Sequence, residues 1–466
     1  MKRSLLTLLL VIVLLPWNTV YAAENDTQSD EAVLFLEKIG IFEPAVNSGS
    51  EMTRGEATAS VVKCMGIDAA SFDDKTFTDI TGGKYAGYIT VANKLNLISG
   101  FEDGSFKPEE KITFNQLVKM LVHATGYRVY AENMGGYPAG YLAIAERNGM
   151  LKGIANAGEA PITMETAARL IKNALDINIM EGVKYSAGHM NYAELENETL
   201  LTKYHSIYKY EGIVTGTYET ALVSDRSIKK GEVAIEGEVF SSGDTNAEDY
   251  FCQYVTAYVK KDDIDSTIIY ISPDKNNKKV SVLSDNILTK TTEKTLWHKD
   301  GNRDTSISIS DDAVLIYNCK MKLSWTKEDL MPQQGEVVLI SPKGGGFKYI
   351  IVNSYETKIV DSVNILEKTV YFKGGGQMKI DREDKSVKTV FKEKNGKDVD
   401  LNYCFEWDIF SIIKSADNKL IKIIRSEDFV SGTITELGEN EIIIDGKAYP
   451  TADSLMENPK LGTPKV

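Results

Sequence analysis

The sequence predicts a multidomain protein in which an α-helical region of three repeated units precedes a run of all-β modules, each a small barrel or sandwich. Between about residues 28 and 180, apolar residues recur at three- and four-residue spacing, as in Ala32-Val33-Leu36-Ile39, which indicates amphipathic helices. From about residue 205 onward the pattern changes to short apolar runs such as Tyr349-Ile350-Ile351-Val352, separated by turn signals such as Asp445-Gly446. This second pattern indicates strands.

The first residues have the pattern of a secretory leader. Lys2 and Arg3 precede an apolar run from Leu5 to Leu15, and a small-residue cleavage site follows at Ala22. Together these features predict a signal peptide over residues 1–22. The apolar run is shorter than the roughly 20 residues that a membrane-spanning helix needs, and no second run of that length follows. We therefore expect an exported protein with no membrane span after the leader is removed.

Charge and cysteine content restrict the partners and the redox chemistry. The formal net charge of −14 at pH 7 disfavours binding to nucleic acid or to anionic membranes, so an anionic partner would need a local basic site. The four cysteines, Cys64, Cys252, Cys319 and Cys404, are far apart, and none belongs to a C-x-x-C pair. We expect them to be small buried side chains rather than a disulfide framework.

One short motif recurs three times in the helical region. Thr53, Thr113 and Thr163 each follow an apolar residue and precede an apolar-periodic helix, which is a favourable N-cap position. Glu56 lies three residues after Thr53 and completes a capping box. Judged from the residues alone, Thr53 and Glu56 are therefore explained by helix structure.

These patterns predict domain boundaries along the whole chain. We expect a signal peptide over 1–22, a truncated first repeat over 28–70, a second repeat over 71–128, a third over 129–180, a connection over 181–204, and β modules over 205–355 and 356–466. The last residues, 459–466, have the pattern of the start of a further strand. That pattern indicates a piece of a longer protein.

The second and third repeats carry a resemblance to a known family. The second reads FTDITGGKYAGYITVANKLNLISGFEDGSFKPEEKIT and the third contains GGYPAGYLAIAERNGMLKG. The chain resembles S-layer homology (SLH) proteins of exported clostridial and bacillar type over about a third of its length. The resemblance implies a three-pronged helical spindle whose grooves hold pyruvylated secondary cell-wall polysaccharide noncovalently, no cofactor, a location in the cell wall or S-layer, and other surface-layer proteins as further partners.

The same resemblance implies which residues bind the polysaccharide. The family's ligand-contacting arginine lies in a Thr-Arg-Ala-Glu motif that survives only as Thr53-Arg54-Gly55-Glu56, and a guanidinium fork suits a planar carboxylate. Phe114 and Met164 stand at the other two arginine positions. The family's groove tryptophan is replaced by tyrosine. The resulting candidates are Thr53, Arg54, Glu56, Tyr85, and either Tyr137 or Tyr141. Lys119 and Arg169 are possible substitute cations, although solvated helix faces explain them better.

The β region contains a weaker internal repeat but no recognisable catalytic motif. Gly212-Ile213-Val214-Thr215 and Gly432-Thr433-Ile434-Thr435 each lead into a hairpin pattern, typical of small barrels or sandwiches. The histidines have no metal-type spacing, and neither H-E-x-x-H nor G-x-S-x-G occurs. The triple-glycine runs at 344–346 and 374–376 are expected to be hairpin turns.

Two features of the β region leave an enzymatic alternative open. Glu406 and Asp408 have the spacing of paired glycosidase carboxylates on one strand face, although solvated edge charges are commoner. Trp297, Trp325 and Trp407 could form a sugar platform, although core packing is the commoner role. We therefore expect a non-enzymatic surface protein whose β modules form a structural or binding stalk. The alternative is an envelope-anchored carbohydrate-active enzyme with an unrecognised catalytic β domain.

Overall fold

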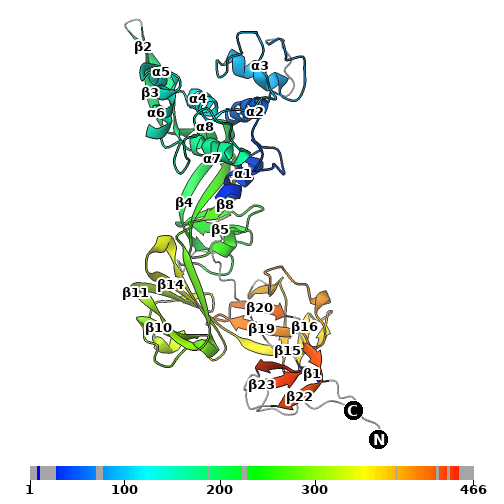
Figure 1. Cartoon of the computed structure of the whole chain (residues 1–466). Helices are drawn as coiled ribbons and strands as arrows, with labels where there is room; N and C mark the ends of the chain where they lie inside the picture. Colours follow the sequence, from blue (N-terminus) through cyan, green and yellow to red (C-terminus); the bar gives the residue numbers. More distant parts are fainter. Residues whose placement is uncertain are drawn as a thin grey trace.

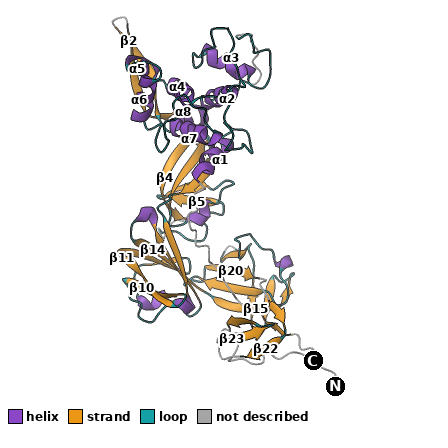
Figure 2. Cartoon of the chain, in the orientation of Figure 1, coloured by secondary structure: helices purple, strands orange, loops and turns teal. Residues whose placement is uncertain are grey.

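The computed structural model describes residues 8–10, 28–69, 77–186, 189–222, 228–384, 386–426, 430–437 and 441–450. A helical region lies at one end, and the β modules follow it in chain order (Figure 1). Figure 2 shows the same division, with the long helices confined to the N-terminal part and strands dominating the remainder. The predicted division into a helical and a β part is confirmed.

Three helix pairs, α1 with α2, α3 with α4, and α6 with α7, build the helical region, and the short α5 lies between the second and third pairs. The second helix of each pair begins directly after one of the three repeated threonines. The helices are α1 (Gln28–Lys38), α2 (Arg54–Cys64), α3 (Ala86–Lys94), α4 (Phe114–Ala124), α5 (Arg128–Asn133), α6 (Ala139–Arg147) and α7 (Met164–Leu175). Thr53 and Thr113 cap α2 and α4 with complete capping boxes, and Thr163 accepts from the backbone of Thr166 at the start of α7. The predicted N-caps are confirmed.

The three units are joined by a closed ring of backbone hydrogen bonds. The amide of Met52 donates to the carbonyl of Ile162 (2.9 Å), Ile162 donates to Ile112 (3.3 Å), and Ile112 donates back to Met52 (3.0 Å). The same exchange satisfies the helix N-termini, because the first amides of α2, α4 and α7 donate to the loops at 108–110, 158–160 and 48–50. A buried amide without a hydrogen-bond acceptor costs free energy. Each unit therefore depends on a neighbouring unit for the acceptors at its helix N-terminus.

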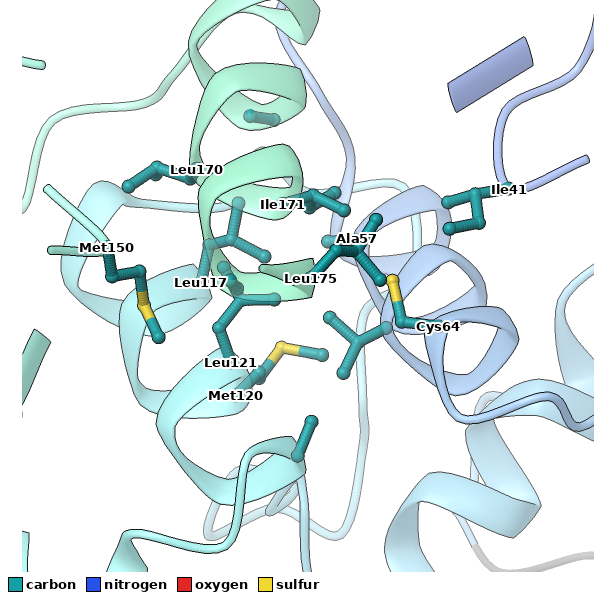
Figure 3. Close-up of a cluster of buried hydrophobic side chains, with 14 of the residues drawn as sticks. Ile41, Ala57, Cys64, Leu117, Met120, Leu121, Met150, Leu170, Ile171 and Leu175 are labelled. Carbon is teal, nitrogen blue, oxygen red and sulfur yellow. The ribbon is translucent and has the colours of Figure 1, made fainter. Parts of the chain in front are cut away.

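Helix packing follows the same cycle. Helix α3 packs on α2, α6 on α4, and α1 on α7. Figure 3 shows side chains of α2, α4 and α7 meeting in one core, among them Ala57, Cys64, Leu117, Leu121 and Leu175. All five are fully buried. The helix predicted around Ala32-Val33-Leu36-Ile39 is confirmed as α1, which covers the apolar face of α7.

The described residues of 181–204, the expected connection, lie in two strands and a short helix. Strands β2 (Asn178–Ser186) and β3 (His189–Thr199) pair antiparallel, and the short helix α8 (Leu200–His205) follows. The polar composition misled the prediction because the distal part of a two-stranded ribbon has no buried face, whereas Leu200 and Leu201 are buried against the helical core.

The first β module follows directly. Strands β4 (Ile207–Gly216), β5 (Glu232–Ile235), β6 (Glu238–Ser241), β8 (Ser266–Pro273) and β7 (Tyr254–Lys261) form a closed barrel in that order. Its outer face packs on the helical region, where Phe35 of α1 contacts Tyr258 (ring centroids 4.3 Å) and Tyr270 (5.4 Å). This contact joins the two parts of the protein.

Two six-stranded sheets form the next modules. The second module contains β9 (Lys278–Leu283), β10 (Thr295–Asp300), β11 (Arg303–Tyr317), β12 (Lys320–Lys322), β13 (Gly335–Ser341) and β14 (Phe347–Ser354). The third contains β15 (Glu356–Asn364), β16 (Thr369–Phe372), β17 (Gln377–Lys379), β18 (Lys388–Glu393), β19 (Ile409–Lys414) and β20 (Leu420–Ser426). Each has its own apolar core. The glycine runs at 344–346 and 374–376 lie between paired strands, as predicted.

The last described strands form a smaller sheet. Strands β22 (Ile434–Leu437), β23 (Glu441–Ile444) and β24 (Lys447–Pro450) pair antiparallel in that order. Nearby, β21 (Val430–Gly432) pairs with β1 (Leu8–Leu10), which lies within the predicted leader. The predicted cleavage site at Ala22 and the final residues 459–466 lie outside the described residues. The four cysteines are buried and free, as predicted.

A partly buried ion network joins the first and third modules. The Glu219 carboxylate, on a turn of the first module, contacts the ammonium groups of Lys422 (2.5 Å) and Lys392 (3.3 Å) of the third. Burial alone would raise the pKa of Glu219, but the two ammonium charges outweigh it and hold the pKa below its ordinary value of 4.5. Glu219 is therefore ionised at neutral pH, and its ion pairs hold the first and third modules together.

Glu219→Gln should destabilise the β region, because it leaves the partly buried Lys422 charge without its carboxylate. We expect a cost of about 3 kcal/mol, which is roughly 6 °C or more in the midpoint of the thermal transition, measured by scanning calorimetry at pH 7. The wild-type advantage should shrink as the pH falls below 4.5 and the carboxylate is protonated. Asp304→Asn, which breaks the exposed pair with Lys290, is the control and should change stability by less than about 0.5 kcal/mol. If the two substitutions lowered the stability equally, the claim that the Glu219 ion pairs hold the modules together would be contradicted.

Candidate binding groove in the helical region

A groove lies between α2 and α4 and is closed at one side by the loop that follows α3. It encloses a pocket of about 240 Å³. The residues lining it come from all three units: Arg54, Thr58, Leu97, Ile98, Ser99, Gly100, Phe101, Phe106, Ile112, Gln116, Lys119, Met120 and Tyr137. Two of them are cationic and none is acidic, although the chain as a whole is acidic.

Arg54 is the first residue of α2, and its side chain crosses into the second unit. Its Nε donates to the carbonyl of Phe106 (3.0 Å) and its Nη1 to Oε1 of Gln116 (3.3 Å). The guanidinium carbon lies 4.6 Å from the ring centroid of Phe106 and 5.0 Å from that of Phe101. These contacts hold the guanidinium plane in place.

The guanidinium of Arg54 keeps donors free for a ligand. Of its five N–H groups, two have protein acceptors, and no described carboxylate forms an ion pair with it. Burial lowers the pKa of Arg54, while Glu110 and Asp79 act in the opposite direction; an arginine remains charged in any case. The arrangement suits a planar anion such as a carboxylate, which arginine binds through two parallel hydrogen bonds.

Lys119 and Tyr137 complete the polar side of the groove. The ammonium of Lys119 lies 5.5 Å from the ring centroid of Tyr137. Tyr137 is 44% exposed, and its hydroxyl donates to Oε1 of Glu159 (2.9 Å), which also accepts from the Asn115 side chain (2.8 Å). This hydrogen bond fixes the orientation of the Tyr137 ring, and the apolar face of the ring remains available to pack against a sugar ring. Lys119, for which the sequence favours a solvated helix face, lines the same pocket as Arg54.

Thr53 and Glu56 have the structural role that the capping pattern predicted. The Thr53 amide donates to Oε2 of Glu56 (2.8 Å), and the Glu56 amide donates to Oγ1 of Thr53 (3.2 Å). Neither residue lines the pocket. Their contribution to the groove is indirect, because they fix the first turn of α2 and with it the position of Arg54.

The remaining tyrosine candidates lie elsewhere. Tyr85 packs over the start of α2, where a Cβ on Gly55 would come within 2.6 Å of its ring; this explains the glycine in the Thr-Arg-Gly-Glu motif. Tyr141 is 1% exposed, and its hydroxyl donates to Oε1 of Glu132 (2.6 Å) and lies 2.7 Å from Nε2 of His123. Of the two alternatives in the third unit, only Tyr137 lines the groove.

The equivalent positions of the other units have no free cation. Phe114 and Met164, which stand where Arg54 stands in α2, are buried in the common core. Arg169 of α7 donates to the carbonyl of Gly153 in its own unit. Arg54, Gln116, Lys119 and Tyr137 line one pocket, whereas Phe114, Met164 and Arg169 give the other two units no comparable cation.

Some groove residues were missed by the sequence analysis. Phe101 and Phe106 lie in the loop between α3 and α4, and Gln116 lies in the first turn of α4. That loop is held by Asp79, whose two carboxylate oxygens accept from the amides of Phe106 (2.7 Å) and Lys107 (2.6 Å). Asp79 belongs to the Phe-x-Asp element of the second repeat, which was the available signal.

The two candidate carboxylates of the β region have ion-pair partners in the structure. Asp408 is 6% exposed and bonds to Arg425 (2.7 Å), while Glu406 pairs with Lys373 (2.6 Å). Paired with different cations, these two carboxylates do not face a shared cavity in the described part of the chain. No group of metal-ligating side chains occurs among the described residues.

Comparison with known proteins identifies residues 76–117 as an S-layer homology domain. The middle cell wall protein of Brevibacillus brevis is 27% identical over 284 residues, which is 54% of this chain and 26% of that protein. The surface layer protein of Brevibacillus choshinensis is 30% identical over 199 residues, or 40% of this chain and 17% of the relative. A cell surface protein of Thermoanaerobacter kivui is 23% identical over 434 residues, or 90% and 52%.

The chain spans about half the length of the Thermoanaerobacter kivui relative and about a quarter or less of the other two. Among the helices that the structure describes, none has the length and apolar character needed to cross a membrane.

Tyr141→Phe should lower the stability of the helical region by about 1 kcal/mol, because it removes the hydrogen bonds to Glu132 and His123. Burial lowers the pKa of His123 to about 4. Thermal unfolding followed by circular dichroism measures the effect. Tyr137→Phe, which loses only an exposed bond, is the control and should unfold within about 0.5 kcal/mol of wild type. Equal losses would show that the two tyrosines are not distinguished by burial.

Proposed function

We propose that this chain is an exported cell-envelope protein that holds pyruvylated secondary cell-wall polysaccharide noncovalently in the groove between α2 and α4. Its β modules form a structural or binding stalk. The observation that carries the proposal is the position of Arg54, a guanidinium with free donors in a preformed pocket beside Lys119 and Tyr137.

The charges of the groove support an anionic ligand. The protein as a whole is acidic and repels polyanions, so a polyanion needs a local cationic site. Arg54 and Lys119 supply two positive charges within one pocket. A pyruvyl ketal presents a compact carboxylate beside a sugar ring, which matches a guanidinium next to an exposed tyrosine face.

The fold and the relatives support attachment at the cell wall. The cyclic packing of three helix pairs agrees with a three-pronged spindle. The S-layer homology match and relatives that are named as cell wall, surface layer and cell surface proteins agree with a location in the cell wall or S-layer. The successive β modules extend away from the groove (Figure 1), as a stalk does.

Binding to purified cell-wall sacculi tests the proposal. The chain without its leader should sediment with intact sacculi and should stay in solution after the secondary polysaccharide has been stripped from them. Arg54→Ala should weaken the binding by about 2 kcal/mol, which is roughly 30-fold. Arg54→Lys should give a smaller but clear loss, because an ammonium cannot bind a carboxylate through two parallel hydrogen bonds. Binding should also weaken with added salt.

Arg169→Ala is the matched control, because it removes an arginine from the α7 face that does not line the pocket. It should sediment as wild type does. Circular dichroism should show unchanged helix content for each variant. Sedimentation that survives stripping of the polysaccharide, or that is unaffected by Arg54→Ala, would contradict the proposal.

A further inference from the structure

The three threonine-capped helices differ in the charge of their first turns. Helix α2 carries Glu56 and α7 carries Glu165 in the first turn, whereas the first turn of α4 contains no acidic residue. An acidic side chain stabilises a helix N-terminus, because the backbone amides leave a partial positive charge there. The stability of the helix alone therefore favours an acidic residue at the start of α4, where the sequence has none.

Gln116 occupies the position in α4 that corresponds to Glu56 in α2. The Thr53 amide donates to Oε2 of Glu56 (2.8 Å), and the Thr113 amide donates in the same way to Oε1 of Gln116 (3.2 Å). A carboxylate makes the stronger hydrogen bond of the two, because it is charged. Gln116 thus completes the same capping box with a neutral and weaker acceptor.

The neighbour of Gln116 supplies a reason for the neutral side chain. Its Oε1 also accepts from Nη1 of Arg54 (3.3 Å), and both residues line the pocket of the groove. A carboxylate in place of this amide would lie at ion-pair distance from the guanidinium. It would compensate the charge of Arg54 and engage donors that the ligand of the groove needs.

The carboxylates already present near Arg54 are engaged elsewhere. Asp79 accepts from the amides of Phe106 (2.7 Å) and Lys107 (2.6 Å), and Glu110 pairs with the ammonium of Lys107 (3.5 Å). Burial lowers the pKa of Arg54, and the charges of Asp79 and Glu110 oppose this effect from a distance. In the described part of the chain, neither carboxylate forms an ion pair with Arg54.

The hydrogen bonds also fix the orientation of the Gln116 amide. The Thr113 amide and Nη1 of Arg54 donate to the same atom of Gln116. That atom must be the oxygen, because the amide nitrogen cannot accept a hydrogen bond. Gln116 therefore holds the guanidinium through a dipole and leaves its net charge in place.

We propose that Gln116 determines the specificity of the groove for anions. Its neutral amide caps α4 and orients Arg54, and the positive charge of the guanidinium remains for an acidic group of the ligand. The ligand is accordingly a carboxylate-bearing glycan, and the same polymer without its carboxylates binds more weakly. The identity of the ligand rests on the proposed function, whereas the role of Gln116 toward a carboxylate does not.

Gln116→Glu in the chain without its leader tests the proposal, because it adds a charge and keeps the cap. Glu56 shows that a carboxylate at this helix position accepts from the threonine amide. The thermal midpoint should therefore equal or exceed that of wild type. The affinity for polysaccharide released from the cell wall should fall at least about tenfold, because a like charge then lies beside the ligand carboxylate.

Two further variants separate charge from structure. Thr166 is the third residue of α7 and does not line the pocket. Thr166→Glu therefore adds the same charge at the same helix position and should bind as wild type does. Gln116→Met removes the capping bond and stays neutral. It should lower the thermal midpoint by about 2 °C or more and keep the affinity within about threefold of wild type.

A comparison of two polymers measures the specificity directly. The released polysaccharide is used before and after mild acid has removed its pyruvyl ketals. Wild type should prefer the intact polymer at least about tenfold, and Gln116→Glu should lose most of this preference. A substitution that only damaged the fold would weaken binding to both polymers equally, so that result would overturn the proposal.

Titration with acetate tests the role of Gln116 without the polysaccharide. The Nε–H signal of Arg54 is followed by nuclear magnetic resonance in sodium acetate, with sodium chloride at the same ionic strength as the reference. The signal should shift in wild type and in Thr166→Glu but not in Gln116→Glu. Equal shifts in wild type and Gln116→Glu, or no shift in wild type, would overturn the proposal.

The two experiments together distinguish this inference from the proposed function. The expected acetate shifts in a wild-type chain that binds no polysaccharide would contradict the proposed function and leave the role of Gln116 supported. Wild type and Gln116→Glu that bind the polysaccharide with equal affinity would overturn the role of Gln116 and leave the proposed function standing.

Discussion

The ring of hydrogen bonds among Met52, Ile112 and Ile162 is the constraint on which the rest of the structure depends. It brings three segments, about 50 to 60 residues apart in sequence, to one point and starts a capped helix from each. The groove exists because this closure sets α2 beside α4, so that a side chain from the first unit reaches the loop of the second. A single unit would leave its helix N-termini without acceptors and would have no groove wall.

The ring also supports the β region. It holds α7 in the centre, α7 supports α1, and Phe35 of α1 receives the first barrel. The Glu219–Lys422 pair adds a contact between modules that are not consecutive.

Local features of the fold could be predicted from the sequence. The threonine caps, the change from helix to strand periodicity and the glycine turns depend on residues close together in the chain, and they are confirmed. The hairpin at 178–199 was missed because most of its side chains face solvent on both sides and give no alternating pattern.

The groove was only partly predictable, because the residues that line it come from distant parts of the sequence. Arg54 was identified through a motif, but its partners Gln116 and Lys119 lie on a helix about 60 residues away. Tyr137 and Tyr141 could not be separated, because their different burial depends on Glu132, His123 and Glu159, which the helix packing brings to them. Thr53 and Glu56 share a motif with Arg54 yet act through the backbone.

Nuclear magnetic resonance of the arginine side chains tests the central claim most directly. The protein is labelled with ¹⁵N at arginine Nε and titrated with polysaccharide released from the cell wall. We predict that the Nε–H signal of Arg54 shifts in proportion to binding while that of Arg169 stays in place, because only Arg54 lines the pocket. An Arg54 signal that does not move when the protein is saturated with polysaccharide would contradict the assignment of this groove as the attachment site.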